Sequence, residues 1–320
     1  MRSYLIVLFM VFSFSVYAAE NATFAVRGEK IYSPTLTGSY LIYIIAPDRL
    51  AGWSGQIMQH EIDHIPKKYQ KLPILGGWNR GQPIDKELIK KEKITKAFVL
   101  GDPDKLSERI DELKSFGMDV LVIKANTLED YFSLFRELGK QMGITNRGNA
   151  LAAFGEEILN KTRTMTKDIP DSDKKYVYVG SGSEGLSAAC SLDSMAIAGG
   201  KHIYDCPAGT ELKVSLEQVA ELDPEIIIIT NPVARKVMDD PEWHRLTAYK
   251  DGKLYIAPFG PFGWLHHFTP YTSLIGTPWL ACKLYPDKCN IDIEKEAKKY
   301  YKLFLNTSLS DKQLIQILYR

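Results

Sequence analysis

The chain has 320 residues, which is enough for two domains with sizeable cores. Its 40 basic and 39 acidic side chains nearly cancel, and this balance lacks the basic excess of a nucleic-acid surface. Beyond the N-terminus, no stretch reaches the ~18 consecutive apolar residues that a membrane helix needs. We therefore expect neither a nucleic-acid partner nor a membrane span.

The N-terminus has the layout of a secretory signal peptide. Met1 and Arg2 give a positive start, residues 4–16 are almost wholly apolar, and the residues up to Ala18 suit signal peptidase. We expect residues 1–18 to be removed and the mature protein to be soluble in the periplasm. Because no cysteine stands at the cleavage site, we expect no lipid anchor. A buried first helix is the alternative interpretation.

Four cysteines remain after cleavage, and an even number in an oxidising compartment favours disulfides. Their spacing suggests the local pairs Cys190 with Cys206 and Cys282 with Cys289. Four cysteines nevertheless allow three pairings. A thiol-bound metal is a further alternative, although the chain has no C-x-x-C pair.

Apolar runs and amphipathic periods alternate along most of the chain, which is typical of an α/β fold with mostly parallel sheets. Strands are predicted at residues 96–100, 118–123, 175–179, 225–230 and 253–257. Helices are predicted at residues 104–116 and 128–142.

One stretch in the middle of the chain interrupts this alternation. Apolar residues recur at helical spacing from Leu151 to Met165, with no strand on either side. We therefore expect a long helix at residues 147–169. It would join two Rossmann-like α/β lobes, at residues 19–146 and 170–320.

Ligands of open α/β sheets bind outside the carboxyl ends of the strands, so the turns after the strands form the candidate site. Aromatic side chains in such turns would hold a flat chelate or macrocycle at little entropic cost. The aromatic candidates are Trp53, Trp78, Phe262 and Trp264. Core packing is the alternative for each of them.

The turn at residues 180–185 reads G-S-G-S-E-G and matches the dinucleotide-binding fingerprint. An exported protein meets little nicotinamide cofactor, so we prefer an amide-rich turn whose Ser181 and Ser183 face an anionic ligand group. Arg80 and Lys124 lie in other turns and could pair with carboxylates or catecholates on a chelate. A surface role is the alternative for Lys124.

Adjacent histidines at positions 266 and 267 follow the last predicted strand. Neutral imidazole is a common metal ligand, so we expect His266 or His267 to line the ligand site and to complete the coordination of a metal in the bound chelate. A structural role under the aromatic residues 261–264 is the alternative. His60 and His64 stand four residues apart, as a helical metal pair would, but a solvated helix face is the simpler interpretation.

Several segments of the chain follow one another in the order and spacing of a known family. They read LPILGGW at 72–78, AGGKHI at 198–203, VSLEQVAELDPEIIIIT at 214–230, DPEWHRLTAYKDGKLYIAP at 240–258, FGW at 262–264 and IGTPWL at 275–280. These segments resemble the class III, or cluster A, periplasmic binding proteins. That family serves ferric siderophores, haem, cobalamin and related metal chelates.

The resemblance covers about residues 27–305 and implies two lobes on one long helix that close only slightly on a ligand in the inter-lobe cleft. It also implies a monomer that delivers its ligand to the permease dimer of an ABC importer in the inner membrane. Two places depart from the family pattern. Residues 93–96 read KITK where relatives usually have Pro-Asp, and His266 and His267 stand where many relatives have a Trp-x-x-x-Pro-Pro run.

We therefore expect a binding protein without a cofactor of its own, whose ligand is an iron chelate, either a siderophore or haem. A nickel or cobalt metallophore or a corrinoid is the alternative ligand. The chain has no nucleophile elbow, no H-E-x-x-H and no cysteine that looks catalytic, which argues against the rival interpretation of an exported two-lobed enzyme. A sensor that presents its ligand to a receptor is a second rival.

Overall fold

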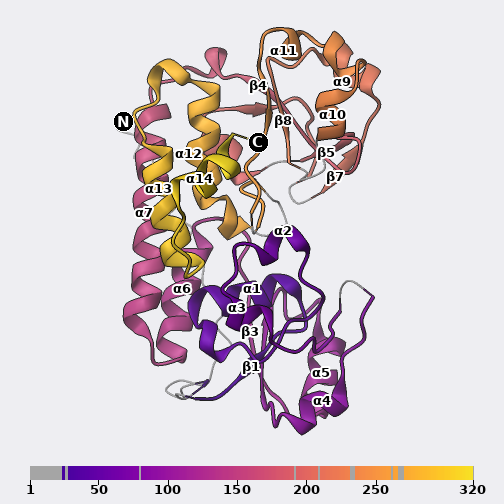
Figure 1. The fold of residues 1–320 in the computed structure, drawn as a ribbon, viewed down its shortest axis with the longest axis vertical. Helices are drawn as coiled ribbons and strands as arrows, with labels where there is room; N and C mark the ends of the chain where they lie inside the picture. Colours follow the sequence, from indigo (N-terminus) through magenta and orange to yellow (C-terminus); the bar gives the residue numbers. More distant parts are fainter. Residues whose placement is uncertain are drawn as a thin grey trace, which may run out of the picture.

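The computed structural model of the chain describes residues 24–25, 28–78, 81–190, 192–207, 210–230, 235–260, 262–265 and 270–319. Figure 1 shows two lobes stacked along the longest axis of the molecule, with one long helix, α7, running along the side of both. The predicted signal peptide lies outside the described residues. Within them, no helix is long and apolar enough to cross a membrane.

The N-terminal lobe is built on a small parallel sheet with the strand order β1-β2-β3. Its strands are β1 Ile31–Tyr32, β2 Lys96–Leu100 and β3 Asp119–Ile123. Its helices are α1 Leu36–Ile45, α2 Gln59–Ile62, α3 Lys67–Gln70, α4 Lys86–Lys91, α5 Ser107–Ser115 and α6 Asp130–Gln141. The strands predicted at 96–100 and 118–123 are found, because short apolar runs between helices are buried on both faces of a parallel sheet.

Helix α7, Thr145–Thr166, joins the lobes. It passes close to α6 at Gly148, where a Cβ atom would lie only 2.3 Å from the carbonyl oxygen of Phe135. The helix ends three residues earlier than the pattern predicts. Pro170 explains the difference, because a proline disfavours helical geometry in the residue before it.

The C-terminal lobe contains a mixed sheet with the strand order β7-β5-β4-β8-β9, and β6 also pairs with β4. Its strands are β4 Tyr176–Ser181, β5 Ser187–Ala189, β6 Lys201–His202, β7 Glu211–Lys213, β8 Ile226–Ile229 and β9 Leu254–Ile256. The pairs β4–β6, β4–β8 and β8–β9 are parallel, whereas β5 and β7 are antiparallel additions at one edge.

The helices of this half fall into two groups. Those of the lobe itself are α8 Asp193–Ile197, α9 Leu216–Leu222, α10 Arg235–Asp239 and α11 Thr247–Lys250. Those that follow it are α12 Ser273–Leu284, α13 Ile293–Phe304 and α14 Asp311–Leu318. Short 3₁₀ turns occupy Pro47–Arg49, Asp171–Asp173, Trp243–Arg245, Pro270–Thr272 and Pro286–Lys288.

Both predicted local disulfides are confirmed. Cys190 and Cys206 are bonded with their Cα atoms 5.4 Å apart, and Cys282 and Cys289 with theirs 4.9 Å apart. No free cysteine is left, so the alternative of a thiol-bound metal is wrong. The first bond closes the chain between β5 and β7, and the second fastens the end of α12 to the turn before α13.

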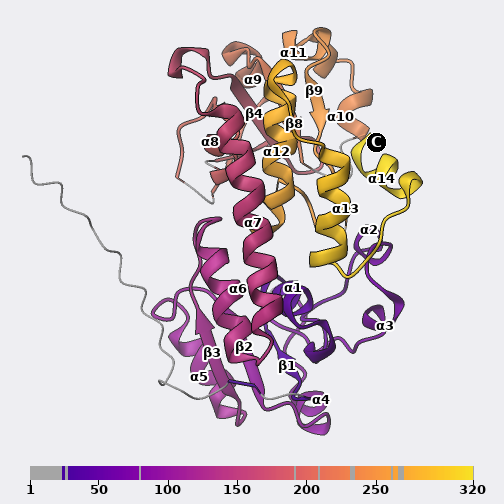
Figure 2. The ribbon, with the colours of Figure 1, turned by 90° about the vertical axis from the view of Figure 1, so that its left-hand side faces the viewer.

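The largest hydrophobic core extends through both lobes. It includes Ile44 of α1, Phe135 of α6, Leu159 of α7, Ile228 of β8 and Leu280 of α12, all fully buried. The core extends through both lobes because α12 and α13 lie beside α7 and return the chain toward the N-terminal lobe (Figure 2). The two lobes therefore share one core, which resists large movements of one lobe against the other.

Candidate functional site

The segments that follow the strands of one lobe contact the other lobe. Phe262, which comes after β9, packs its ring on Tyr40 of α1 with centroids 3.8 Å apart. The backbone N–H of Leu128, which comes after β3, donates to Asp193 at the start of α8 over 3.0 Å. The carboxyl ends of the two sheets thus face each other, which is where open α/β sheets bind ligands.

Residues 259–265, which follow β9 and are called the β9 segment below, carry two of the predicted aromatic site residues. Phe262 is 5% exposed and Trp264 is 1% exposed. The Trp264 indole N–H donates to the hydroxyl of Tyr301 over 3.4 Å. Both rings therefore pack inward in this structure. Pro261 lies outside the described residues.

Trp53 is also buried, at 1% exposure. Its indole N–H donates to the backbone oxygen of Tyr69 over 2.8 Å, and the rings of Tyr40 and Tyr43 each lie with their centroids 5.8 Å from that of Trp53. Trp53 therefore packs against α1 in the core of the N-terminal lobe.

Trp78 is the most accessible of the four predicted aromatic residues. Its backbone N–H donates to Pro34, in the turn between β1 and α1, over 2.8 Å, and the Arg109 guanidinium lies 5.3 Å from its ring centroid. The indole N–H is buried and has no hydrogen-bond partner among the described residues. Trp78 thus brings an aromatic face and a buried donor to the facing edge of the N-terminal lobe.

Lys124 already has a partner. Its ammonium lies 2.7 Å from the Asp102 carboxylate, which links the turns after β2 and β3. The hydrogen bond from Lys124 lowers the pKa of Asp102. The positive charge of Lys124 is therefore balanced within the lobe, and an exposed pair of this kind adds little stability.

Ser181 lies at the end of β4 and faces a carboxylate. Its hydroxyl donates to Glu211 over 2.8 Å, and Ser187 donates to the other carboxylate oxygen of Glu211, also over 2.8 Å. Ser183, in the turn between β4 and β5, is exposed. The turn leads into strand β5, whereas a dinucleotide site needs the N-terminus of a helix there.

The remaining predicted site residues, Arg80, His266 and His267, lie outside the described residues. So does the side chain of His60, which leaves the suggested His60–His64 pair undescribed. Within the described part of the chain, no group of three or more His, Cys, Asp or Glu side chains is arranged to hold a metal ion.

His202 and His244 have structural contacts. His202 Nε2 accepts a hydrogen bond from the N–H of Leu192 over 3.1 Å, and burial lowers the pKa of this imidazole to about 4. His244 stacks on Tyr249 and bonds to the backbone oxygen of Met238 over 2.7 Å.

The buried imidazole of His202 predicts acid sensitivity. In the unfolded chain it takes up a proton near pH 6.5, but in the folded chain only near pH 4, so stability falls as the pH drops through this window. Between pH 7.5 and 5, we expect the free energy of unfolding to fall by about 2 kcal/mol less in His202→Gln than in the wild type. Glutamine can accept the same hydrogen bond but does not titrate. Urea unfolding of both proteins at both pH values measures it, and equal losses would contradict the assignment.

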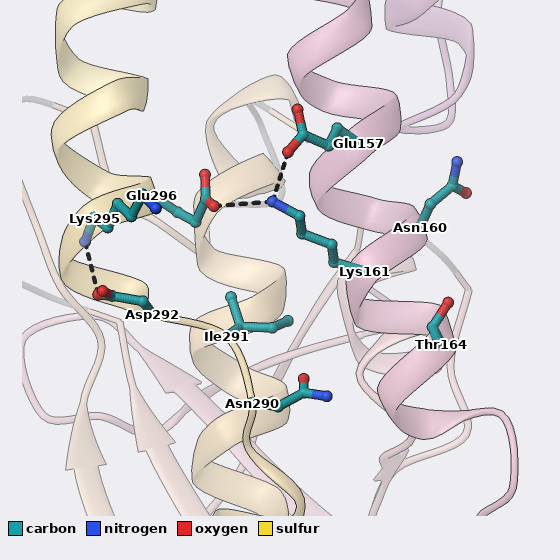
Figure 3. A pocket seen from close by; sticks show the side chains of 9 residues that line it. All are labelled: Glu157, Asn160, Lys161, Thr164, Asn290, Ile291, Asp292, Lys295 and Glu296. Atoms are coloured by element: carbon teal, nitrogen blue, oxygen red, sulfur yellow. Dashed lines mark hydrogen bonds and ion pairs between the residues drawn. The ribbon is translucent and has the colours of Figure 1, made fainter.

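A groove of about 680 Å³ runs between α7 and the start of α13 (Figure 3). Its lining residues come from α7, from α13 and from the three residues before α13: Glu157, Asn160, Lys161, Thr164, Asn290, Ile291, Asp292, Lys295 and Glu296. None of them directly follows a strand of either sheet, so the groove lies away from the facing edges of the two sheets.

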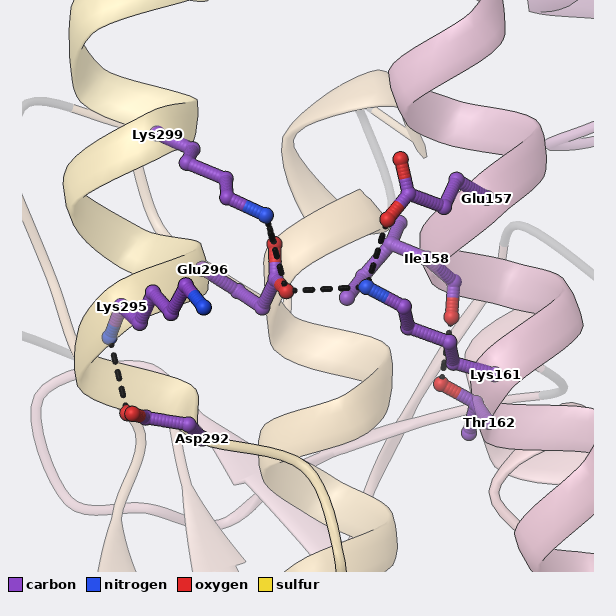
Figure 4. Close-up of polar contacts among 8 residues, drawn as sticks. All are labelled: Glu157, Ile158, Lys161, Thr162, Asp292, Lys295, Glu296 and Lys299. Atoms are coloured by element: carbon purple, nitrogen blue, oxygen red, sulfur yellow. Dashed lines mark hydrogen bonds and ion pairs between the residues drawn. The ribbon is translucent and has the colours of Figure 1, made fainter.

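Three charged side chains of this groove, Glu157, Lys161 and Glu296, form ion pairs with one another (Figure 4). The Lys161 ammonium lies 2.5 Å from Glu157 and 3.0 Å from Glu296, and Lys299 also reaches Glu296, at 3.2 Å. Glu296 is only 6% exposed, so its two cations offset the cost of burying its charge. The groove fastens α13 to α7, and we do not assign it as the ligand site.

A sequence profile of the family described as "periplasmic binding protein" matches residues 98–260, about half of the chain. The chain belongs to this family, and its two lobes on a single long helix place it in class III. No curated protein is significantly similar in sequence.

Solved structures agree with this assignment. An ABC transporter solute-binding protein from Sulfurospirillum deleyianum DSM 6946 is 28% identical, with a TM-score of 0.81 over 93% of this chain and 94% of that one. The molybdate-bound protein MolA of Haemophilus influenzae is 19% identical, with a TM-score of 0.71 over 88% and 94%. Helicobacter pylori CeuE with Ni(II) bound is 18% identical, with a TM-score of 0.65 over 91% and 94%.

Proposed function

We propose that this chain is the exported, monomeric solute-binding component of an ABC importer. Its partner would be the permease dimer in the inner membrane, and it would carry out no chemistry on its ligand. The observation that carries the proposal is that the segments after β3 and β9 each contact a helix of the other lobe. The 28% identity to an ABC transporter solute-binding protein, over almost the whole of both chains, supports it.

For the ligand we propose an iron chelate, either a siderophore or haem, bound between the lobes. Trp78 supports this choice, because its ring is partly exposed and a flat chelate gains from an aromatic face. A nickel or cobalt metallophore or a corrinoid is the alternative.

Within this site the aromatic residues divide into two roles. Trp78 is partly exposed and would contact the ligand, whereas the buried Trp53, Phe262 and Trp264 would support the walls from behind. Ser183 is exposed and Ser181 is bonded to Glu211, so the edge of the C-terminal lobe would offer hydroxyl and carboxylate groups. Lys124 would contribute its ammonium group, which is paired with Asp102, to the ligand site.

Three residues outside the described part complete the proposed site. Arg80 would pair with an acidic group of the chelate, and His266 or His267 would complete the coordination of its metal. Replacing both histidines with alanine should then weaken binding of the metal-loaded chelate far more than binding of the metal-free chelator.

Calorimetric titration tests the proposal. The titrants are ferric tris-catecholate, ferric trihydroxamate, haem, cyanocobalamin and a Ni(II) chelate, each beside its metal-free form where one exists. We expect one site per chain for an iron chelate. Trp78→Ala should weaken that binding by about 1–3 kcal/mol, the scale of a buried aromatic contact.

Tyr176→Ala is the matched control, because Tyr176 is 50% exposed and starts β4 at the amino edge of its sheet. This variant should bind like the wild type. Binding of the nickel chelate or the corrinoid alone would select the alternative ligand. If the chain bound none of the titrants, the proposal of a metal-chelate ligand would lose its support.

A further inference from the structure

Tyr301 of α13 contacts the β9 segment at two points. Its hydroxyl donates to the backbone oxygen of Gly260 and accepts the indole N–H of Trp264 over 3.4 Å. The side chain is fully buried, and burial raises the pKa of the hydroxyl far above its usual range. The hydroxyl therefore keeps its proton and remains a donor at every pH at which the chain is folded.

The N-terminal lobe meets the β9 segment at the same place. Gly260 has a positive φ of 142°, and a Cβ atom there would lie 2.6 Å from Nε2 of His64. The ring of His64 in turn lies with its centroid 5.9 Å from that of Tyr301. The positive φ favours glycine at position 260, the His64 ring lies close on one side, and Tyr301 of α13 contacts the same residue.

Elements outside the sheet of the C-terminal lobe hold the rest of the segment as well. Tyr40 of α1 packs on Phe262, and the Thr272 hydroxyl donates to the backbone oxygen of Gly263 over 2.8 Å. The backbone N–H of Trp264 donates to the backbone oxygen of Pro258, just before the segment, over 3.1 Å, so the segment curves back on itself. The segment follows β9, but helices α1, α12 and α13 determine where it lies.

We propose that Tyr301 is a positioning residue of the ligand site, whose hydroxyl holds the β9 segment against the N-terminal lobe and so sets the shape of the C-terminal wall. This inference rests on the proposed binding of a ligand between the lobes. Tyr301 acts through Gly260 and Trp264 and does not touch the ligand. A phenylalanine in its place would leave a buried carbonyl and a buried indole N–H without a partner, and moving the segment is the simplest way to hydrate both.

The test compares Tyr301→Phe with Tyr43→Phe. Tyr43 is equally buried and its hydroxyl also donates to a backbone oxygen, that of Leu305, outside the β9 segment. Both variants lose one buried phenolic hydroxyl, so they should lose similar stability. Only Tyr301→Phe should speed hydrogen exchange in the peptide 258–265, on the order of ten-fold.

The second readout is affinity for ferric tris-catecholate, measured by calorimetry. Tyr301→Phe should bind it roughly ten-fold more weakly than Tyr43→Phe, because the wall is displaced. Equal exchange in the two variants, or unchanged affinity despite faster exchange, would overturn the inference. If the wild type does not bind this complex, the siderophore proposal loses its support, while the exchange comparison still decides whether Tyr301 positions the segment.

Discussion

Replacing Arg147 with methionine should lower the free energy of unfolding by about 3–4 kcal/mol, because several buried acceptors would lose their donor at once. One nitrogen of the guanidinium donates to Ile44 and Leu303, each over 2.7 Å. Further bonds reach Ile45 and Asn306. The three backbone acceptors lie in the last turns of α1 and α13, where carbonyls have no partner within their helix.

The matched control is Arg136→Met. Arg136 forms a two-point ion pair with Glu156 at 2.7–2.8 Å, but the two side chains are 43% and 40% exposed. An exposed pair is worth less than about 1 kcal/mol, so this variant should stay close to the wild type. Urea unfolding followed by circular dichroism compares the two. Similar losses for both would contradict the role of Arg147 as the donor that links α7 to the ends of α1 and α13.

Gly276→Ala should destabilise the protein by about 2–3 kcal/mol, although this substitution usually stabilises a helix. Gly276 lies inside α12, and a Cβ atom there would stand 1.9 Å from the backbone oxygen of Trp264. A backbone atom cannot rotate away, so either α12 or the β9 segment has to move. Thermal unfolding measures the loss.

Gly155→Ala provides the comparison, because this glycine lies inside α7 and its Cβ would meet the ring of Phe132 at 2.4 Å. A ring can turn where a backbone carbonyl cannot, so we expect a smaller loss than for Gly276→Ala. If Gly276→Ala were as stable as the wild type, the tight contact between α12 and the β9 segment would be refuted.

Much of the fold could be predicted from the sequence, because the decisive signals are local. Apolar runs of four residues mark β2, β3 and β8, and short spacing favoured the two disulfides. The antiparallel strands β5 and β7 were missed. Each is three residues long, and β7 reads E-L-K with all three side chains exposed, so neither has the period-two apolar pattern that marks a half-buried strand.

The candidate site was harder to predict, because contacts between distant residues decide which turn side chains are buried. Trp53 and Trp264 stand in the expected turns, but Tyr69 and Tyr301 draw their indoles into the core. Arg147 binds carbonyl groups up to 156 residues away, and no spacing in the sequence signals this. Tyr301 lies on the apolar face of an amphipathic helix, a pattern that predicts core packing and nothing more specific.

We propose that the chain carries a metal-containing small molecule between its lobes. Native mass spectrometry with elemental analysis of the protein isolated from the periplasm of its own cells tests it most directly. We expect one additional mass per chain, accompanied by about one equivalent of iron, and both should be lost together on unfolding. A bound organic molecule without stoichiometric metal would contradict the account.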